Sequence, residues 1–235
     1  MAKTAAATSS VTQVYKRLRE SITRGDHQPG APLRLQELAL TYGVSMIPVR
    51  EALRRLEAEE FVEIIPNKGA RVAPLSAADL HDVYGMRMLI EAEALRLAFP
   101  KIDATTLDTA RRLNEQMEAA LRQGDPAAHK AHRALHFALY EPAESRWLIR
   151  LVGILWDHCE RYRRLATDQM GADALSAEHT RLFDLVAAGD LNGALTHLRS
   201  HIQWTVDILR RLYDEIEEPV PYVPDTVVDN LDQDH

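Results

Sequence analysis

The chain has 235 residues, 46% of them hydrophobic, and a formal net charge of −7. Its length exceeds the usual size of one domain, so we expect two domains, and its one cysteine, Cys159, excludes an intrachain disulfide and suits a reducing cytoplasm. No apolar run has the length of a signal peptide or a membrane span, so we expect a cytoplasmic protein with no membrane partner. The charge is uneven: residues 1–75 hold 11 Lys and Arg against 8 Asp and Glu, and the rest 17 against 27.

The first 75 residues have the pattern of a winged helix-turn-helix domain. Apolar residues recur at helical spacing in three segments, and Gly43 stands where the second segment needs a left-handed residue to end. Ser45 can cap the third helix, and two β-type runs flank the turn "PNKG". The expected elements are helices over 11–24 and 34–43, a helix that starts after Ser45, and strands over 61–65 and 70–74. Together they predict one domain over 11–75.

The next part, 76–213, shows no convincing strand and predicts an all-α antiparallel bundle. Ser76 or Asp79 can start its first helix, and Asp103 can cap its second. We expect six amphipathic helices, over 76–99, 104–124, 126–141, 145–166, 174–189 and 191–216. The segment 214–235 holds eight acidic residues and three prolines and is expected to be a disordered tail. The fold class is therefore mainly α, with a small β-hairpin wing in the N-terminal domain.

Several segments resemble one family of bacterial proteins. "GVSMIPVREALRRLEAEEFVEIIPNKGARVAPLS" resembles the helix-turn-helix and wing of GntR-family transcription regulators almost position by position. "YGMRMLIEAEALRLA", "HRALHFALYE", "EHTRLFDLVAAGD" and "LRSHI" occur in the order of the FadR-type C-terminal effector domain, the FCD domain. The resemblance covers about 11–213. It implies a homodimeric regulator, more often a repressor, that binds an inverted-repeat operator in double-stranded DNA and a small carboxylate effector.

The resemblance also implies which residues contact DNA. Arg50 lies on the helix expected to enter the major groove, where a guanidinium can donate two hydrogen bonds to guanine, so it is the predicted base reader. Met46 stands where family members commonly have arginine, and Gln36 where some do, so the family's operator sequence cannot be transferred. The alternative is that these basic residues only form the solvent-exposed face of a helix and do not contact DNA. The predicted DNA-binding residues are Arg50, Ser45, Met46, Gln36, Arg54, Arg55, Lys16, Lys68 and Gly69.

His132 and His136 are four residues apart in "AHRALHFAL" and therefore share a helix face. Two such rings can bind one metal ion or can simply be packed in a core. The resemblance favours a metal, because many FCD domains bind one through an aspartate and a histidine on one helix and a histidine on each of two later helices. His136, His179 and His201 match the three histidines, and His132 replaces the aspartate. Four imidazole ligands suit a divalent ion such as zinc or nickel. His197, one turn before His201, could replace it.

Arg87 matches an arginine that faces the same cavity in similar proteins, where it can clamp an effector carboxylate. The alternative for Arg87 is a surface ion pair with Glu91, one helical turn away. Other interpretations are open. The protein could be a metal-dependent hydrolase. Alternatively, the bundle could serve only for dimerisation, or it could bind its effector in a pocket without a metal. Glu178 adjoins His179, but successive helical residues point about 100° apart, so no general base is recognisable. We therefore expect a regulator and not an enzyme.

Overall fold

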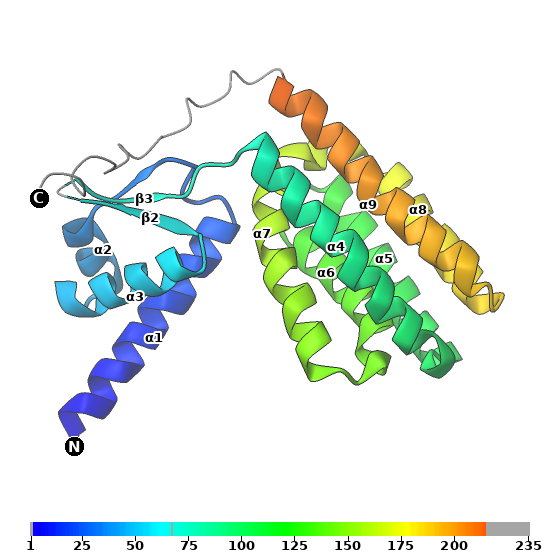
Figure 1. Cartoon of the computed structure of the whole chain (residues 1–235), viewed down its shortest axis with the longest axis horizontal. Coiled ribbons are helices and arrows are strands. Elements are labelled where there is room, and N and C mark those ends of the chain that lie inside the picture. Colours follow the sequence, from blue (N-terminus) through cyan, green and yellow to red (C-terminus); the bar gives the residue numbers. More distant parts are fainter. Residues whose placement is uncertain (1, 67, 215–235) are drawn as a thin grey trace, which may run out of the picture.

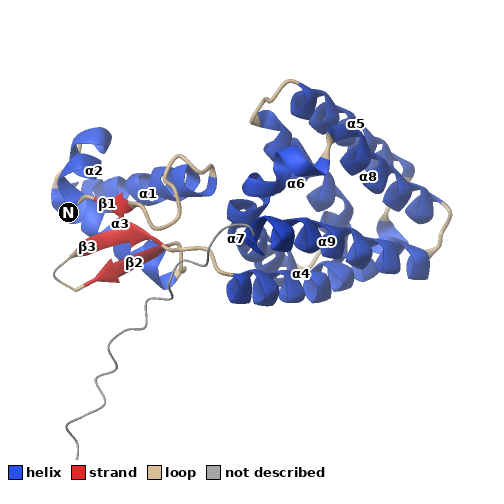
Figure 2. Ribbon diagram, turned by 90° about the horizontal axis from the view of Figure 1, so that it is seen from above, coloured by secondary structure: helices blue, strands red, loops and turns tan. Residues whose placement is uncertain are grey.

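Two hydrophobic cores organise the chain, in a computed structural model that describes residues 2–66 and 68–214. The smaller core belongs to the N-terminal part, where helices pack against a small sheet. The larger core lies among the helices of the C-terminal part, and the two parts lie side by side (Figures 1 and 2). The N-terminal elements are α1 (Ala2–Thr23), β1 (Pro32–Leu33), α2 (Leu35–Tyr42), α3 (Met46–Ala58), β2 (Val62–Ile65) and β3 (Gly69–Val72).

The predicted hairpin forms, and it gains a strand that was not predicted. β3 lies between β1 and β2, antiparallel to both, with Val62 opposite Val72 and Ile65 opposite Gly69. Gly69 has a φ of +95°, a conformation that glycine adopts without strain, so it can close the turn of the wing. β1 escaped prediction because the two residues of Pro32–Leu33 are too few to show an alternating pattern.

The first N-terminal helix differs from prediction at its start, whereas the third begins directly after Ser45, as predicted. α1 begins at Ala2 and not near residue 11, because the early residues are mostly Ala, Thr and Ser, which show no apolar periodicity even though Ala favours helix. Gly43 ends α2 as predicted, with a φ of +65° and its N–H bonded to carbonyl groups of the last turn. Ser45 stands at the N-cap position of α3, but its side chain makes no capping hydrogen bond, contrary to expectation.

The predicted helices of the bundle are present and surround the larger core. They are α4 (Ala77–Ala98), α5 (Ala104–Arg122), α6 (Ala127–Tyr140), α7 (Arg146–Met170), α8 (Ala172–Ala187) and α9 (Leu191–Asp214), with short 3₁₀ turns at Phe99–Lys101 and Glu141–Ala143. Ser76 and Asp103 cap α4 and α5 as predicted, because their side chains accept hydrogen bonds from the backbone N–H groups of Asp79 and Thr106. These caps set where each helix enters the bundle.

The last helix is followed by residues that the structure does not describe. α9 continues to Asp214, so the first residue of the predicted tail is helical. The rest of that tail, 215–235, lies outside the described residues, and its disorder stays a prediction. Across 2–66 and 68–214, every helix is too short or too polar to cross a membrane.

α7 joins the two parts of the molecule. Arg19 Nη1, on α1, forms an ion pair of 2.6 Å with Asp157 Oδ2, on α7. The next residue along α7, His158, packs its ring against Phe61 with 4.4 Å between ring centres. Because α7 also contributes buried residues to the larger core, a displacement of this helix would change contacts in both parts.

Candidate DNA interface and candidate metal centre

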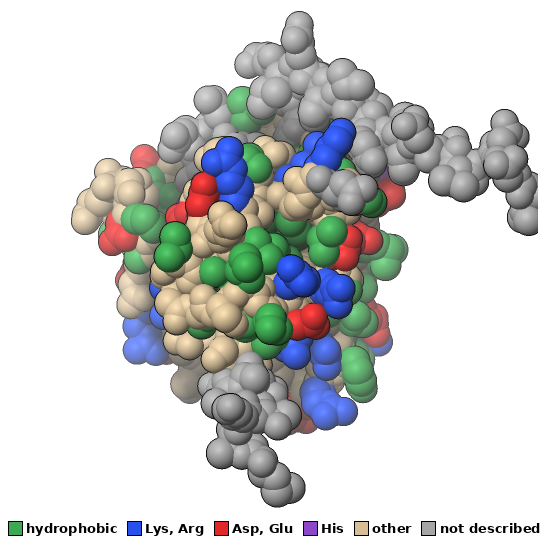
Figure 3. All heavy atoms as spheres, turned by 90° about the vertical axis from the view of Figure 1, so that its left-hand side faces the viewer, with side chains coloured by type: hydrophobic (Ala, Val, Ile, Leu, Met, Phe, Trp, Pro, Cys, Tyr) green, Lys and Arg blue, Asp and Glu red, His purple; other side chains and the backbone are tan. Residues whose placement is uncertain are grey.

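The predicted DNA contacts lie on the surface of the winged helix-turn-helix, and all nine of these residues are exposed. Figure 3 looks at the side of the molecule that this part forms: apolar side chains gather near the centre of the view, and Lys and Arg side chains lie beside them. Met46 and Ile47, in the first turn of α3, are 46% and 71% exposed. An exposed apolar pair at this place suits contact with thymine methyl groups in the major groove, and Ile47 was not predicted.

α3 turns an apolar face inward and a basic face outward. Val49 and Leu53 are buried, whereas Arg50 and Arg54 are exposed one helical turn apart. Arg54 Nη1 lies 3.3 Å from Glu51 Oε1, a surface ion pair for which DNA phosphates can compete. The first turn of α3 has no side-chain cap, so its backbone N–H groups can also meet a phosphate.

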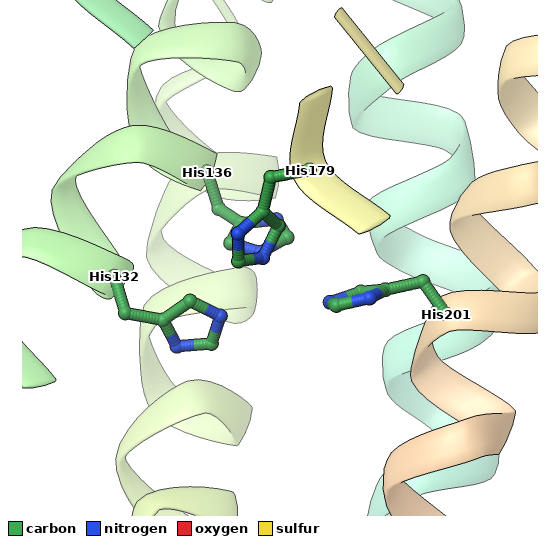
Figure 4. Close-up of side chains that lie close together, drawn as sticks. All are labelled: His132, His136, His179 and His201. Carbon is green, nitrogen blue, oxygen red and sulfur yellow. The ribbon is translucent and has the colours of Figure 1, made fainter. Parts of the chain in front are cut away.

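Four histidine side chains meet inside the bundle. His132 and His136 come from α6, His179 from α8 and His201 from α9, and their rings point into a common space (Figure 4). Their exposed fractions are between 0% and 4%. Each ring offers a nitrogen within 4.8 Å of the nitrogens of the other three, and His136 Nε2 lies 3.2 Å from His179 Nε2. The structure therefore brings together all four residues that the sequence singled out.

A chain of hydrogen bonds fixes which nitrogen of His179 carries the proton. His179 Nδ1 lies 2.9 Å from Asn114 Oδ1, which can only accept, so Nδ1 donates. The amide of Asn114 is oriented by its Nδ2, which donates to the carbonyl and hydroxyl oxygens of Ser176 at 3.0 Å. Ser176 donates in turn to a carboxylate oxygen of Glu118. The neutral ring of His179 consequently has its lone pair on Nε2, the atom that faces His136.

A second chain of hydrogen bonds fixes His136 in the same way. Tyr140 donates its hydroxyl proton to Glu91 Oε2 at 2.8 Å, and its oxygen accepts from His136 Nδ1 at 3.3 Å. Glu91 is held by Arg87, whose Nε donates to its other oxygen. His136 therefore also has its lone pair on Nε2. Two lone pairs face one another at 3.2 Å, and a cation bound between the rings would stabilise that arrangement.

The electrostatic setting keeps the four rings in the form that binds metal. Burial, together with nearby positive charge, lowers the pKa of His132, His136 and His179 well below the ordinary value and that of His201 to about 3. The rings are therefore neutral at pH 7, as metal ligation requires.

The unpaired atoms and the spacing of the cluster also fit a metal ion. In the part of the chain that the structure describes, both ring nitrogens of His132 and Nδ1 of His201 are buried without a hydrogen-bond partner. Such atoms are costly, and coordination would satisfy them. Metal–nitrogen bonds of about 2.1 Å place the ligand nitrogens of a tetrahedral site roughly 3.4 Å apart, so the observed cluster needs only a small contraction.

Comparison with known protein families matches both parts of the chain. Residues 10–72 match the model for bacterial regulatory proteins of the gntR family. Residues 82–203, half of the chain, match the FCD domain. The chain belongs to the GntR family. Its FCD domain is the C-terminal domain that the sequence motifs resemble.

The relatives of this GntR-family protein are transcription regulators. It is 32% identical over 213 residues to the HTH-type transcriptional regulator BphR of Paraburkholderia xenovorans, covering 86% of each chain. It is 30% identical over 208 residues to the HTH-type transcriptional repressor GlaR of Escherichia coli, covering 84% of this chain and 94% of GlaR. The structure of E. coli McbR/YncC shares the fold, with a TM-score of 0.74 at 24% identity over 87% of this chain and 98% of that one. The chain is thus a DNA-binding regulator and not an enzyme, as expected, and the hydrolase alternative loses its support.

Arg87 of this GntR-family regulator is linked to the histidine cluster through Trp156 and Glu91. The predicted alternative, an ion pair with Glu91, does form, but in the interior and not at the surface, with side chains 6% and 0% exposed. The Arg87 guanidinium carbon also lies 4.4 Å from the centre of the Trp156 ring. Trp156 packs in turn on His132 and His136, with 5.3 and 5.1 Å between ring centres.

Some residues around the cluster were misjudged or missed from the sequence. His197 does not replace His201, because its Nε2 lies 2.8 Å from the carbonyl oxygen of Glu178, outside the group of four. Tyr140 was missed although it lies one turn after His136, a spacing that could have indicated it. Asn114 was also missed; its signal is a polar residue on the buried face of α5.

Proposed function

We propose that this GntR-family protein is a ligand-responsive repressor whose FCD domain holds zinc or nickel and binds a small carboxylate effector. The observation that carries the metal is the pair of Nε2 lone pairs on His136 and His179, fixed 3.2 Å apart by two hydrogen-bond chains. His132 and His201 complete a set of four nitrogen donors. Repression is supported by the relative GlaR, which is named as a repressor.

The effector would bind beside the histidines. A bound metal ion supplies a positive charge for a carboxylate, and nickel accepts more than four ligands readily. Arg87 packs on Trp156, which contacts His132 and His136, and we propose that it adds a charge-assisted hydrogen bond to that carboxylate. Effector binding alters DNA binding only if it favours one arrangement of the winged helix-turn-helix over another.

The double variant His136→Ala, His179→Ala tests the metal site. Elemental mass spectrometry should find about one zinc or nickel ion per chain in the unaltered protein and none in the variant, because two of four ligands are lost. The variant should still bind DNA, since the winged part has its own core. His197→Ala is the matched control: it removes a histidine of α9 outside the cluster and should keep its metal.

Stoichiometric metal in the double variant would contradict the assignment. A thermal-shift screen of small carboxylic acids, with and without a chelator, tests the effector in the same samples. Stabilisation that disappears on chelation supports an effector bound at the metal. Stabilisation that survives chelation favours the metal-free pocket instead.

We propose that α3 reads the operator in the major groove. Arg50 is the principal base reader, and the apolar Met46 contacts thymine methyl groups. All nine predicted residues are exposed, which supports the assignment. The residues that would face the bases are Arg50, Gln36, Ser45 and Met46, and those that would contact phosphates are Arg54, Arg55, Lys16 and Lys68. Gly69 would let the backbone of the wing approach the groove closely.

The variant Arg50→Ala tests the base reader. It should lose specific binding by about 1–3 kcal/mol while it keeps its affinity for unrelated DNA, because base contacts specify and phosphate contacts do not. Fluorescence anisotropy at one salt concentration, with an operator selected from a random pool and a scrambled duplex, measures both affinities. Arg199→Ala, an exposed arginine of α9, is the control. An unchanged ratio of the two affinities in Arg50→Ala would contradict the role of Arg50 as a base reader.

We further propose that two copies of the chain form a homodimer through the bundle, since an inverted-repeat operator mirrors a two-fold axis. The support is a set of apolar side chains on α4 and α7, each at least 40% exposed: Met86, Leu89, Trp147, Leu151 and Ile154.

We also propose the domain boundaries that the sequence indicates, with a DNA-binding domain over 11–75 and an effector domain over 76–213.

A further inference from the structure

A cavity of about 510 Å³ lies between the winged part and the bundle. None of the four clustered histidines lines it. One wall is the end of α1 with the loop that follows, residues 22–29, and the other consists of the turn before α6, part of α7 and the start of α8. In Figure 2, α1 runs toward the bundle on this side. The volume of the cavity lies in the range of small-molecule sites.

Most of the charged residues that line this interdomain cavity are cationic. Its charged and titratable residues are Arg24, Arg161, Arg164, His27, His129 and Asp125, three guanidinium groups against one carboxylate. Glu160, beneath the wall, is shared by Arg163, Arg164 and His129 and so cannot neutralise all of them. Burial alone would raise the pKa of Glu160, but Arg163 and His129 hold it at about 2. Asp26 neutralises Arg24 with an ion pair of 2.8 Å, so a smaller net positive charge, from Arg161 and Arg164 against Asp125, remains at the cavity.

Arg164 and Thr23 contribute polar atoms to the wall of the cavity. Arg164 Nε and Thr23 Oγ1 are buried and make no hydrogen bond within the described residues, although Arg164 Nε lies 3.3 Å from Glu160 Oε1. Burial lowers the pKa of Arg164, while the carboxylate of Glu160 raises it. α8, a helix of 16 residues, starts at the cavity with Gly171 at its N-cap position and no side-chain cap. Its first N–H groups and the positive end of its dipole add to the attraction for an anion.

We propose that the interdomain cavity is a second ligand site, which binds a small dianion through carboxylate or phosphate oxygens. Guanidinium groups and an uncapped helix start are the donors that such oxyanions prefer. Because each part of the molecule contributes one wall, a bound anion holds the winged part against the bundle in the arrangement seen here. The site is independent of the effector site proposed at the histidines.

Isothermal titration calorimetry with inorganic phosphate and with succinate tests this site on the full chain. Both probes are run on the unaltered protein, on the double variant Arg24→Gln, Arg164→Gln and on the control Arg199→Gln. The Arg24 side chain is half exposed and forms a surface ion pair with Asp26. Its replacement should therefore leave the fold intact, so Arg24→Gln alone is the test variant if the double variant fails to fold. Each lost charge-assisted hydrogen bond should weaken binding by about tenfold.

The expected result is millimolar or tighter binding of at least one probe, weakened in the cavity variants and unchanged in Arg199→Gln and in His136→Ala, His179→Ala. The last variant keeps this test separate from the metal proposal. Hydrogen exchange should show protection of residues 22–29 together with 171–175, since both walls contact the anion. Binding of phosphate alone identifies a phosphoryl ligand, and binding of succinate alone a dicarboxylate. Absence of binding, or equal affinity in the cavity variants, overturns the proposal.

Discussion

Asn114 shows how an uncharged side chain can prepare a metal ligand without touching the metal. It is 4% exposed and uses both ends of its amide, because Oδ1 accepts from His179 and Nδ2 donates to Ser176. The lone pair of His179 is thereby directed at His136 before any ion arrives. Loss of such a partner typically weakens metal affinity by about 10- to 100-fold.

The variant Asn114→Leu isolates this positioning role. The zinc affinity, measured by competition with a chromophoric chelator, should fall by about 10- to 100-fold because the His179 proton is no longer held on Nδ1. In the metal-free protein, ¹⁵N spectra of the imidazoles should change from one tautomer of His179 to a mixture, an effect that loss of packing alone would not produce. Asn192→Leu, at an exposed position of α9, is the control. Unaltered spectra and affinity in Asn114→Leu would refute the role.

The four histidines could be predicted, and the spacing of Tyr140 from His136 was also visible in the sequence, whereas the pairing of Asn114 with His179 was not. His132 and His136 share a helix face by their spacing, and the resemblance supplied the other two. Asn114 stands on the buried face of α5, where a polar side chain needs a partner, but its partner His179 is 65 positions further along the chain. No local pattern connects residues that far apart, so only the packing of α5 against α8 reveals the pair.

The outward face of α4 and α7 is unusually apolar for a surface. Trp147, Leu151 and Ile154 lie at helical spacing along one stripe of α7, and Met86 and Leu89 along one stripe of α4. Met86 and Ile154 line the same shallow pocket, so the two stripes are adjacent. A contiguous exposed apolar patch of this kind marks an interaction surface, and a second copy of the chain is the partner we propose.

Charges placed in the middle of this face should separate the homodimer. The variant Leu89→Glu, Leu151→Glu should elute as a monomer in size-exclusion chromatography with light scattering, because four carboxylates would be buried together in a two-fold interface. The control is Leu40→Glu, since Leu40 is 83% exposed but lies on α2, away from the face. It should remain dimeric. A dimer in the double variant would show that the interface lies elsewhere.

Elements were predictable where their signal repeats within one segment. The six bundle helices could be placed because apolar periodicity and capping residues such as Ser76 and Asp103 agree. The early part of α1 has helix-favouring composition but no periodicity, and β1 is too short to have a pattern. Ser45 has the right residue type for a cap, yet its hydroxyl is left without that bond.

At the scale of the whole molecule, α7 connects the histidine cluster with the winged part. Trp156 packs on His132 and His136. The next residue, Asp157, forms ion pairs with Arg19 on α1 at 2.6 Å and with Arg133 on α6 at 2.7 Å. A change at the cluster that moves Trp156 would therefore also disturb the contact that fixes the winged part.

The variant Asp157→Asn should loosen the winged part while leaving both cores intact. It removes the charge that two partly exposed arginines share, at a cost of roughly 1 kcal/mol, which is too little to unfold either core. Small-angle X-ray scattering should show a larger radius of gyration, and thermal unfolding should separate into two transitions. Asp184→Asn is the matched control, because the Asp184 ion pair with Arg111 lies wholly within the bundle. If Asp157→Asn scatters and unfolds like the unaltered protein, Asp157 does not hold the two parts together, and other contacts of α7, such as His158 on Phe61 and Arg161 on the carbonyl oxygen of Ala73, do so instead.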